Sequence, residues 1–312
     1  MTAETRAVIT GEPGVAEPKH RKRLTEGARA DRRLGWMLCA PAVIVMIAVA
    51  AFPIIYAIWL SLQRYDLRFP QQAKFIGFGN YGAVLSSPYW WHALVVTLII
   101  TIVSVAIEFV LGMLLALLMF RTLFFRGTVR TIILIPYGIV TVAAAYGWQY
   151  AWTPDTGYLS ALFNNSAPLT KTGASIAIII LAEVWKTTPF MALLLMAGLS
   201  LVPEDLLKAA RVDGASAWQR FYGVMLPLMK PAILVALLFR TLDAFRIFDN
   251  IYVLTQGGNG TYSVSILGYD NLFRGLNLGI GSAISILIFV CVAIIAFIFI
   301  KFFGAAAPGT EG

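Results

Sequence analysis

The sequence has only two cysteines, Cys39 and Cys291, and two histidines, His20 and His92. Both cysteines lie in apolar stretches, so we predict that they fill space among apolar side chains and form no disulfide. So few histidines argue against a histidine metal site. Charged residues are also scarce, at 13% of 312 residues, and the sequence contains no G-x-x-x-x-G-K-[ST] phosphate loop. A soluble globular domain is therefore excluded, as is nucleotide hydrolysis through a phosphate loop in this chain.

Long apolar stretches fill most of the sequence. Apolar residues make up 59% of it, which is the composition of a polytopic helical membrane protein. We predict an all-α fold with six transmembrane helices, at about residues 35–62, 93–120, 131–152, 175–202, 228–254 and 279–303. Residues 1–33 are predicted to be a disordered basic tail, 34–304 the transmembrane domain, and 305–312 a short second tail.

Lysine and arginine are distributed unevenly among the predicted loops. Eight of the 24 precede Leu34, three lie in the 121–130 loop and four lie in a polar loop at 202–231, hereafter the long loop. The loops on the other side carry about three, one, and one to three. The positive-inside rule therefore predicts that both termini and the long loop are cytoplasmic, in a bacterial cell membrane. The formal net charge of +8 then reflects membrane topology and membrane lipid, and we predict no nucleic-acid partner.

The long loop is predicted to form a helix, a turn and a second helix. The dipeptide Asp213-Gly214 is typical of a turn. Ser216 is suited to cap the helix that follows it. That second helix is expected to end where Pro227 and Pro231 interrupt it. Such a rigid hydrophilic unit between two membrane spans is suited to transmit motion to a partner.

The long loop also resembles the EAA loop of ABC importer permeases, whose pattern is EAA, three residues, glycine and, after a short gap, leucine-proline. The matching residues here are Ala209, Ala210, Asp213, Gly214, Ala215, Leu226, Pro227 and Pro231. Lys208 stands where the family has glutamate. The resemblance implies that the chain is coupled to an ATPase through Lys208, Ala209, Ala210, Arg211, Asp213, Gly214, Ala215, Ser216 and Arg220.

Among those permeases, the sequence is similar to the carbohydrate, maltose-permease-like type. The resemblance implies a type I importer transmembrane domain that carries a disaccharide such as trehalose or maltose. The implied partners are a second homologous permease, two copies of an ATP-binding subunit and an extracytoplasmic sugar-binding protein. ATP and Mg would be bound by the ATP-binding subunit, so no cofactor and no enzymatic activity are expected in this chain.

Polar side chains lie at similar depths in three predicted spans, at about 1.5 Å per helical residue. Such residues normally face protein or water and mark a pathway. They are Tyr137 and Thr141 in the third span, Glu183 and Lys186 in the fourth, and Arg240 and Asp243 in the fifth. We expect them to line one cavity, where hydroxyl-bonding groups and aromatic rings suit a sugar.

The family resemblance extends to this cavity. Carbohydrate permeases have a sugar-contacting tyrosine and, four residues later, a serine, both after a proline, and Tyr137 and Thr141 follow Pro136 in that pattern. Trp185 and Pro189 match the next group of the family. The resemblance implies further contacts at Thr187, Phe190, Ala244 and Ile247.

Structural roles for the same charged residues remain open. Glu183 and Lys186 equally fit an ion pair within one helix, and Glu108, the one charge in its span, fits a structural hydrogen bond. The charges that recur every third residue in the fifth span spiral around the helix instead of sharing a face; they are Arg240, Asp243, Arg246 and Asp249. A different class of protein, an ion-coupled secondary carrier, would use Glu108, Glu183 or Asp243 as its ion site.

Overall fold

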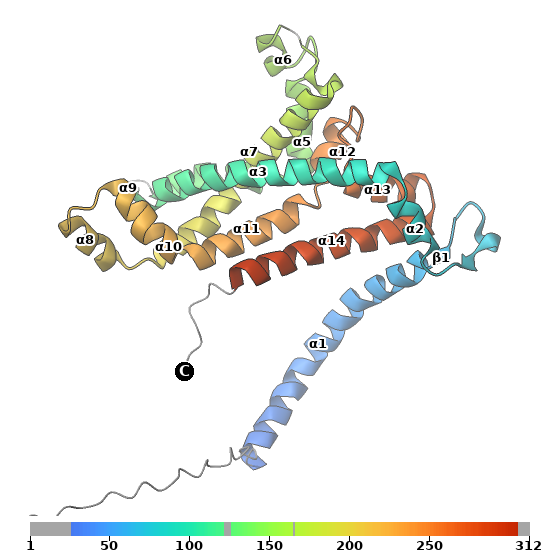
Figure 1. The fold of residues 1–312 in the computed structure, drawn as a ribbon, viewed down its shortest axis with the longest axis horizontal. Helices are drawn as coiled ribbons and strands as arrows, with labels where there is room; N and C mark the ends of the chain where they lie inside the picture. Colours follow the sequence, from blue (N-terminus) through green and yellow to red (C-terminus); the bar gives the residue numbers. More distant parts are fainter. Residues whose placement is uncertain (1–25, 122–125, 165, 305–312) are drawn as a thin grey trace, which may run out of the picture. The chain divides into compact units, whose positions relative to one another are not determined.

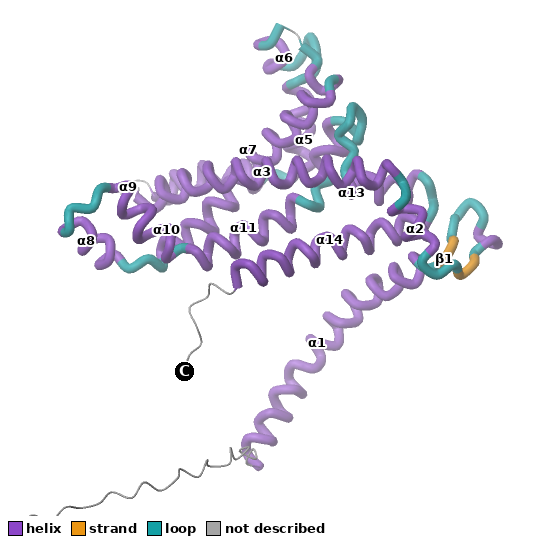
Figure 2. The backbone as a smooth tube through the Cα atoms, viewed as in Figure 1, coloured by secondary structure: helices purple, strands orange, loops and turns teal. Residues whose placement is uncertain are grey.

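The computed structural model describes residues 26–121, 126–164 and 166–304. The predicted tails at 1–25 and 305–312 lie outside these residues. The chain forms two units, residues 1–54 and 55–312, and helices account for nearly all of the regular structure (Figure 2).

Helix α1 (Glu26–Ser61) supplies the described part of the first unit. It begins before the predicted start at Leu34, so residues 26–33 are helical and the prediction of a disordered tail is wrong for them. Their Glu, Ala and Arg side chains favour helix, which explains the earlier start. The apolar side chains from Leu34 onward are mostly exposed, as expected of a helix whose natural surroundings are lipid tails.

The second unit holds the remaining helices and one small hairpin (Figure 1). The first half comprises β1 (Gln63–Arg64), β2 (Lys74–Phe75), α2 (Gly79–Leu85), α3 (Pro88–Arg121), α4 (Arg126–Gly138), α5 (Thr141–Ala151), α6 (Tyr158–Leu162) and α7 (Thr172–Ser200). The second half comprises α8 (Glu204–Val212), α9 (Ala217–Arg220), α10 (Leu226–Leu228), α11 (Lys230–Ala244), α12 (Asp249–Leu254), α13 (Val264–Tyr269) and α14 (Leu278–Gly304). Short 3-10 turns (Pro70–Gln72, Pro168–Thr170) and π-helical segments (Phe221–Met225, Asp270–Arg274) complete the unit.

Helices α3, α7 and α11 form the packed centre of this unit. Small residues let their backbones approach closely, as is common between membrane helices. A Cβ on Gly198 of α7 would lie 2.5 Å from the Cβ of Ala232 in α11. Leu195 and Met229 are fully buried at the same contact. The three helices therefore make a rigid frame for whatever lies between them.

Four helices are long and apolar enough to cross a membrane, namely α1, α3, α7 and α14. Two bent helix pairs bring the number to six if each pair is one span, namely Gly127–Gly138 with Thr141–Ala151 (84°) and Ala217–Leu228 with Lys230–Leu254 (70°). The predicted third span at about 131–152 is bent, because Val140 takes an extended conformation (ψ 132°) between α4 and α5. Gly138 ends α4, and glycine is a weak helix former.

The long loop folds as two helical arms around a tight turn. Gly214 has a φ of +81° at this turn, which glycine adopts without strain. The predicted cap is confirmed, since Ser216 and Gln219 form a reciprocal capping box at α9. The predicted end between Pro227 and Pro231 is confirmed, because the helical backbone continues from α9 through Phe221–Met225 and α10 to Leu228 and then bends by 70° into α11. Pro227 sits in the first turn of α10, where its missing N–H is tolerated.

The close approach of α7 and α11 predicts an asymmetry between two glycine substitutions. Gly198→Ala should destabilise the protein by about 1–3 kcal/mol, because the new methyl group meets a backbone-anchored methyl group. Gly147→Ala in α5 should be neutral, since no atom lies within 4 Å of its Cβ position. Thermal unfolding of the detergent-extracted protein measures both, and equal melting temperatures would contradict the close approach.

Candidate functional site

A buried arginine joins three helices at the centre of the second unit. Arg240 of α11 donates from Nε and Nη2 to the Glu108 carboxylate of α3, at 2.5 and 3.0 Å. Its Nη2 also donates to Glu183 Oε1 of α7 at 2.5 Å, and Nη1 to Asp243 Oδ2 at 2.7 Å. Asn250 donates to the second oxygen of Glu183 at 2.5 Å. Every charge deep in this cluster therefore has both an opposite charge and hydrogen bonds, without which burial would be costly.

This cluster settles two of the alternatives. Glu183 pairs with Arg240 on another helix, so an ion pair between Glu183 and Lys186 is not the arrangement found. Glu108 accepts hydrogen bonds from Arg240, which confirms the predicted structural bond and names its partner. Asp243 differs from the two glutamates, because its side chain is 64% exposed. Asp243 is thus the carboxylate of the cluster that faces open space.

Lys186 stabilises the break between α4 and α5. Its Nζ donates to the Ile139 carbonyl at 2.7 Å and lies 3.4 Å from the Tyr137 carbonyl. The last carbonyls of a helix have no partner within the helix and carry partial negative charge. The ammonium group satisfies them, which explains how the chain tolerates an extended Val140 here. The same amine lies 5.7 Å from the centre of the Tyr137 ring.

A cavity of about 460 Å³ opens where these groups meet. Its lining residues are Tyr137, Thr141, Glu183, Lys186, Thr187, Asp243, Arg246, Ile247, Phe248, Asp249 and Asn250. Seven of the ten residues predicted for the path line this cavity. The other three lie close behind: Phe190 stacks on Tyr137 with ring centres 5.2 Å apart, while Arg240 and Ala244 are buried.

Four lining residues are not among those predicted for the path: Arg246 and Asp249, which belong to the charges that spiral around the helix, and Phe248 and Asn250, which no sequence pattern singled out. All four lie beyond the point where α11 ends, and α12 restarts the helix at Asp249 in a new direction. A single straight helix would have turned them elsewhere. The signals available were the amide of Asn250 and the charges of Arg246 and Asp249 close to it in the sequence.

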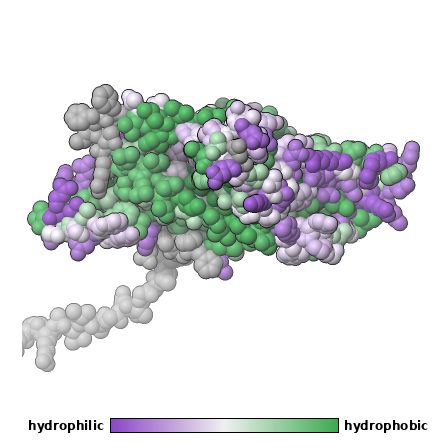
Figure 3. Space-filling model, turned by 90° about the horizontal axis from the view of Figure 1, so that it is seen from above, coloured by the Kyte–Doolittle hydropathy of each residue, from purple (hydrophilic) through white to green (hydrophobic). Residues whose placement is uncertain are grey.

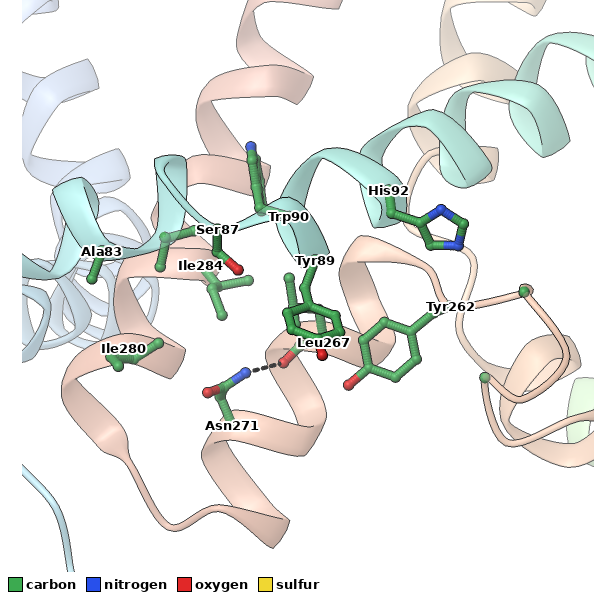
Figure 4. A pocket seen from close by; sticks show the side chains of 13 residues that line it. Ala83, Ser87, Tyr89, Trp90, His92, Tyr262, Leu267, Asn271, Ile280 and Ile284 are labelled. Atoms are coloured by element: carbon green, nitrogen blue, oxygen red, sulfur yellow. Dashed lines mark hydrogen bonds between the residues drawn. The ribbon is translucent and has the colours of Figure 1, made fainter.

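A larger cavity of about 610 Å³ lies elsewhere, between the start of α3 and helices α13 and α14 (Figure 4). Its described lining has no Asp, Glu, Lys or Arg, and is formed by Ala83, Val84, Ser87, Tyr89, Trp90, His92, Gly257, Gly260, Tyr262, Leu267, Asn271, Ile280 and Ile284. The Asn271 amide nitrogen donates to the backbone carbonyl of Leu267. This larger cavity has fewer convergent polar groups, so it is the weaker candidate for the functional site despite its volume.

The long loop presents both charged and apolar side chains to its surroundings. Lys208 lies 3.5 Å from Glu204 and 3.5 Å from Asp205, so its charge is balanced within its own helix. Val212 is 87% exposed and Trp218 70% exposed. Apolar side chains cover the middle of the visible face of the molecule, and hydrophilic ones gather toward both ends (Figure 3). An exposed apolar patch at such an end is typical of a contact with another protein.

The chain is similar to known transport proteins. A family model described as "Binding-protein-dependent transport system inner membrane component" matches residues 108–307. The "Trehalose transport system permease protein SugA" of Mycobacterium tuberculosis is 68% identical over 288 residues, which cover 92% of this chain and 94% of that protein. The "Trehalose/maltose transport system permease protein MalF" of Thermococcus litoralis is 40% identical over 278 residues, covering 87% and 94%.

A solved structure has the same fold. It is a bacterial alginate ABC transporter in complex with an alginate pentasaccharide-bound periplasmic protein. The TM-score is 0.74 at 25% identity, with 89% of this chain and 96% of that chain covered. An all-helical polytopic permease fold is therefore established for this chain.

The buried cluster predicts different outcomes for two arginine substitutions. Arg240→Met leaves Glu108 and Glu183 buried without their cation, and should cost about 3–5 kcal/mol of stability. Arg246→Met is the matched control, because Arg246 is exposed and, among the residues that the structure describes, donates to a backbone carbonyl, that of Leu242, so its loss should be within about 0.5 kcal/mol. Melting temperatures of the detergent-extracted proteins test this.

A second substitution checks the mechanism. Combining Arg240→Met with Glu108→Gln removes one uncompensated charge and should recover part of the lost stability. No recovery would show that the Glu108 charge is not what destabilises Arg240→Met.

Proposed function

Since this chain belongs to the binding-protein-dependent transport system inner membrane components, we propose that it is the subunit through which an ATP-driven importer passes a disaccharide of the trehalose type. As a family member it is a multi-pass transport subunit without a catalytic domain. The observation that carries the choice of sugar is the 68% identity, over 92% of the chain, to a trehalose permease.

The cavity suits an uncharged, hydroxyl-rich solute. The carboxylate of Asp243 and the amide of Asn250 can bond sugar hydroxyls, and the ring of Tyr137 offers an apolar face for sugar C–H groups. Each deep carboxylate, Glu108 and Glu183, is already paired with Arg240. A neutral ligand can therefore enter without leaving a buried charge unpaired.

The same pairing argues against an ion-coupled carrier. Glu108 and Glu183 both bind Arg240, and a carboxylate held by a guanidinium is a poor site for a proton or a sodium ion. Family membership points the same way, because binding-protein-dependent systems take their solute from a separate protein.

The proposed assembly contains this chain, a second homologous permease, two copies of an ATP-binding subunit and an extracytoplasmic sugar-binding protein. The likeness to a transporter solved with its periplasmic protein supports this composition. We place both termini and the long loop in the cytoplasm, on the distribution of Lys and Arg. ATP-driven closure of the ATP-binding subunits would push the long loop, and the spans would rock so that the cavity opens outward.

Import by the assembled complex tests the proposal. Reconstituted in proteoliposomes with its partner subunits, loaded binding protein and ATP, the wild-type chain should support trehalose uptake that an uncoupler does not abolish. Tyr137→Leu should lower the uptake rate up to about tenfold by removing a stacking surface. Tyr146→Leu is the control, since Tyr146 is exposed on α5 outside the cavity lining. Uptake by this chain alone, sensitive to an uncoupler, would instead support an ion-coupled carrier.

The long loop should bind the ATP-binding subunit mainly through its exposed apolar residues. Val212→Glu should reduce sugar-stimulated ATPase activity about tenfold or more, because it puts a charge into an apolar contact. Lys208→Met should change this activity less than about twofold, since Glu204 and Asp205 already balance that charge. Copurification of the ATP-binding subunit provides the second readout, and a large loss with Lys208→Met would refute the apolar contact as the main one.

A further inference from the structure

Four aromatic rings form a continuous row that starts at the cavity. Phe248, which lines the cavity, stacks on Tyr252 with ring centres 5.2 Å apart. Tyr269 contacts both of these rings, at 5.1 and 5.3 Å. Phe273 extends the row from Tyr269 at 5.0 Å. Residues from two separate segments, α12 and the α13–Asp270–Arg274 segment, thus combine into one row.

The row is graded in exposure. Phe248, Tyr252 and Tyr269 are half-buried, whereas Phe273 at the far end is 66% exposed. Phe273 and Arg274 belong to a π-helical segment, a conformation that is rare and frequent at functional sites. This segment and α13 lie at the end of the unit opposite α8 (Figure 1). In the proposed orientation, this segment therefore lies on the outer side of the unit.

A fixed cation lies alongside the row. The Arg274 guanidinium lies 5.8 Å from the Tyr252 ring centre and 5.9 Å from that of Tyr269. Asp270 holds it by an ion pair at 3.2 Å, and the nearby Asp270 charge raises the pKa of Arg274. The Tyr262 hydroxyl donates to the other Asp270 oxygen at 2.5 Å. Burial raises the pKa of Tyr262, as does its bond to Asp270, so this donor keeps its proton.

Rings and a guanidinium together make a surface with the chemistry of a carbohydrate. The C–H faces of a sugar pack on aromatic rings, and N–H donors of arginine bind its hydroxyls. The Arg274 side chain is 48% exposed, so some of the N–H donors of its guanidinium group are accessible to a ligand. Simple core packing would not leave the outermost ring and this cation exposed together.

We propose that Phe248, Tyr252, Tyr269 and Phe273, with Arg274 beside them, form a second sugar-binding subsite that guides a disaccharide from the outer face to the cavity. The subsite rests on the proposed function of sugar import. It deepens that function, because it assigns a path to the solute before it reaches the charged cavity. The rings give affinity through contact area alone, so successive positions are similar in energy and the sugar can move between them.

The test compares aliphatic and aromatic replacements in the reconstituted complex. At saturating loaded binding protein, Phe273→Leu and Tyr269→Leu should slow trehalose uptake about three- to tenfold. Phe273→Trp should keep at least about half of the wild-type rate, because a ring remains. Phe289→Leu, an exposed ring of α14 outside the row, should be unchanged. Basal ATPase activity and copurification of the partner subunits should match wild type in all variants.

Other outcomes would overturn the subsite. Wild-type rates in both leucine variants would show that the rings do not guide sugar. Loss of the second permease on purification of these variants would show that the row packs against a subunit instead. A wild-type complex that imports no sugar would overturn the proposed function, and the subsite with it. If the wild-type complex imports sugar and both leucine variants import it at the same rate, the subsite is overturned and the proposed function is not.

Discussion

The ion pairs of Arg240 are the interaction on which the rest of the site depends. One guanidinium binds carboxylates from α3 and α7 and a third from its own helix. Because a buried charge without a partner is costly, these helices cannot separate or rotate independently at this point. The cluster therefore fixes the floor of the cavity. The positions of Asp243 and Asn250 in the cavity lining therefore depend on the bonds of this cluster.

Two irregular backbones complete the cavity, and both are held by side chains from the frame. Lys186 bonds the carbonyls at the end of α4, and Asn250, just after the restart at α12, bonds Glu183. Helices that break inside a membrane must have their freed polar groups satisfied by neighbours. Here Lys186, which satisfies backbone carbonyls, and Asn250, which bonds a side chain of α7, both also line the cavity. The polar groups that hold these backbones thus also belong to the cavity lining.

Hydropathy was enough to predict an all-helical polytopic fold, and residue type was enough to predict the capping of α9 by Ser216, because each depends on residues close in sequence. Depth along the helices also predicted that Tyr137, Glu183 and Asp243 would meet. Neither signal could identify Glu108 as the partner of Arg240, since 132 positions separate them and hydropathy does not report which way a buried helix faces. The break at Val140 was missed for a related reason. It is stabilised by Lys186, which lies on a different helix.

The bond between Lys186 and the end of α4 also has a mechanical consequence. The charged side chain of Lys186 links α7 to the joint between α4 and α5, with 2.7 Å between Lys186 Nζ and the Ile139 carbonyl oxygen. If α7 moved away from this joint, the ammonium group would leave the Ile139 carbonyl, and a helix end would lose its donor inside the membrane. The joint must therefore follow α7 as it moves. Movement of α7 would therefore displace α4 and α5 where they meet, and with them the part of the cavity wall that Tyr137 and Thr141 form.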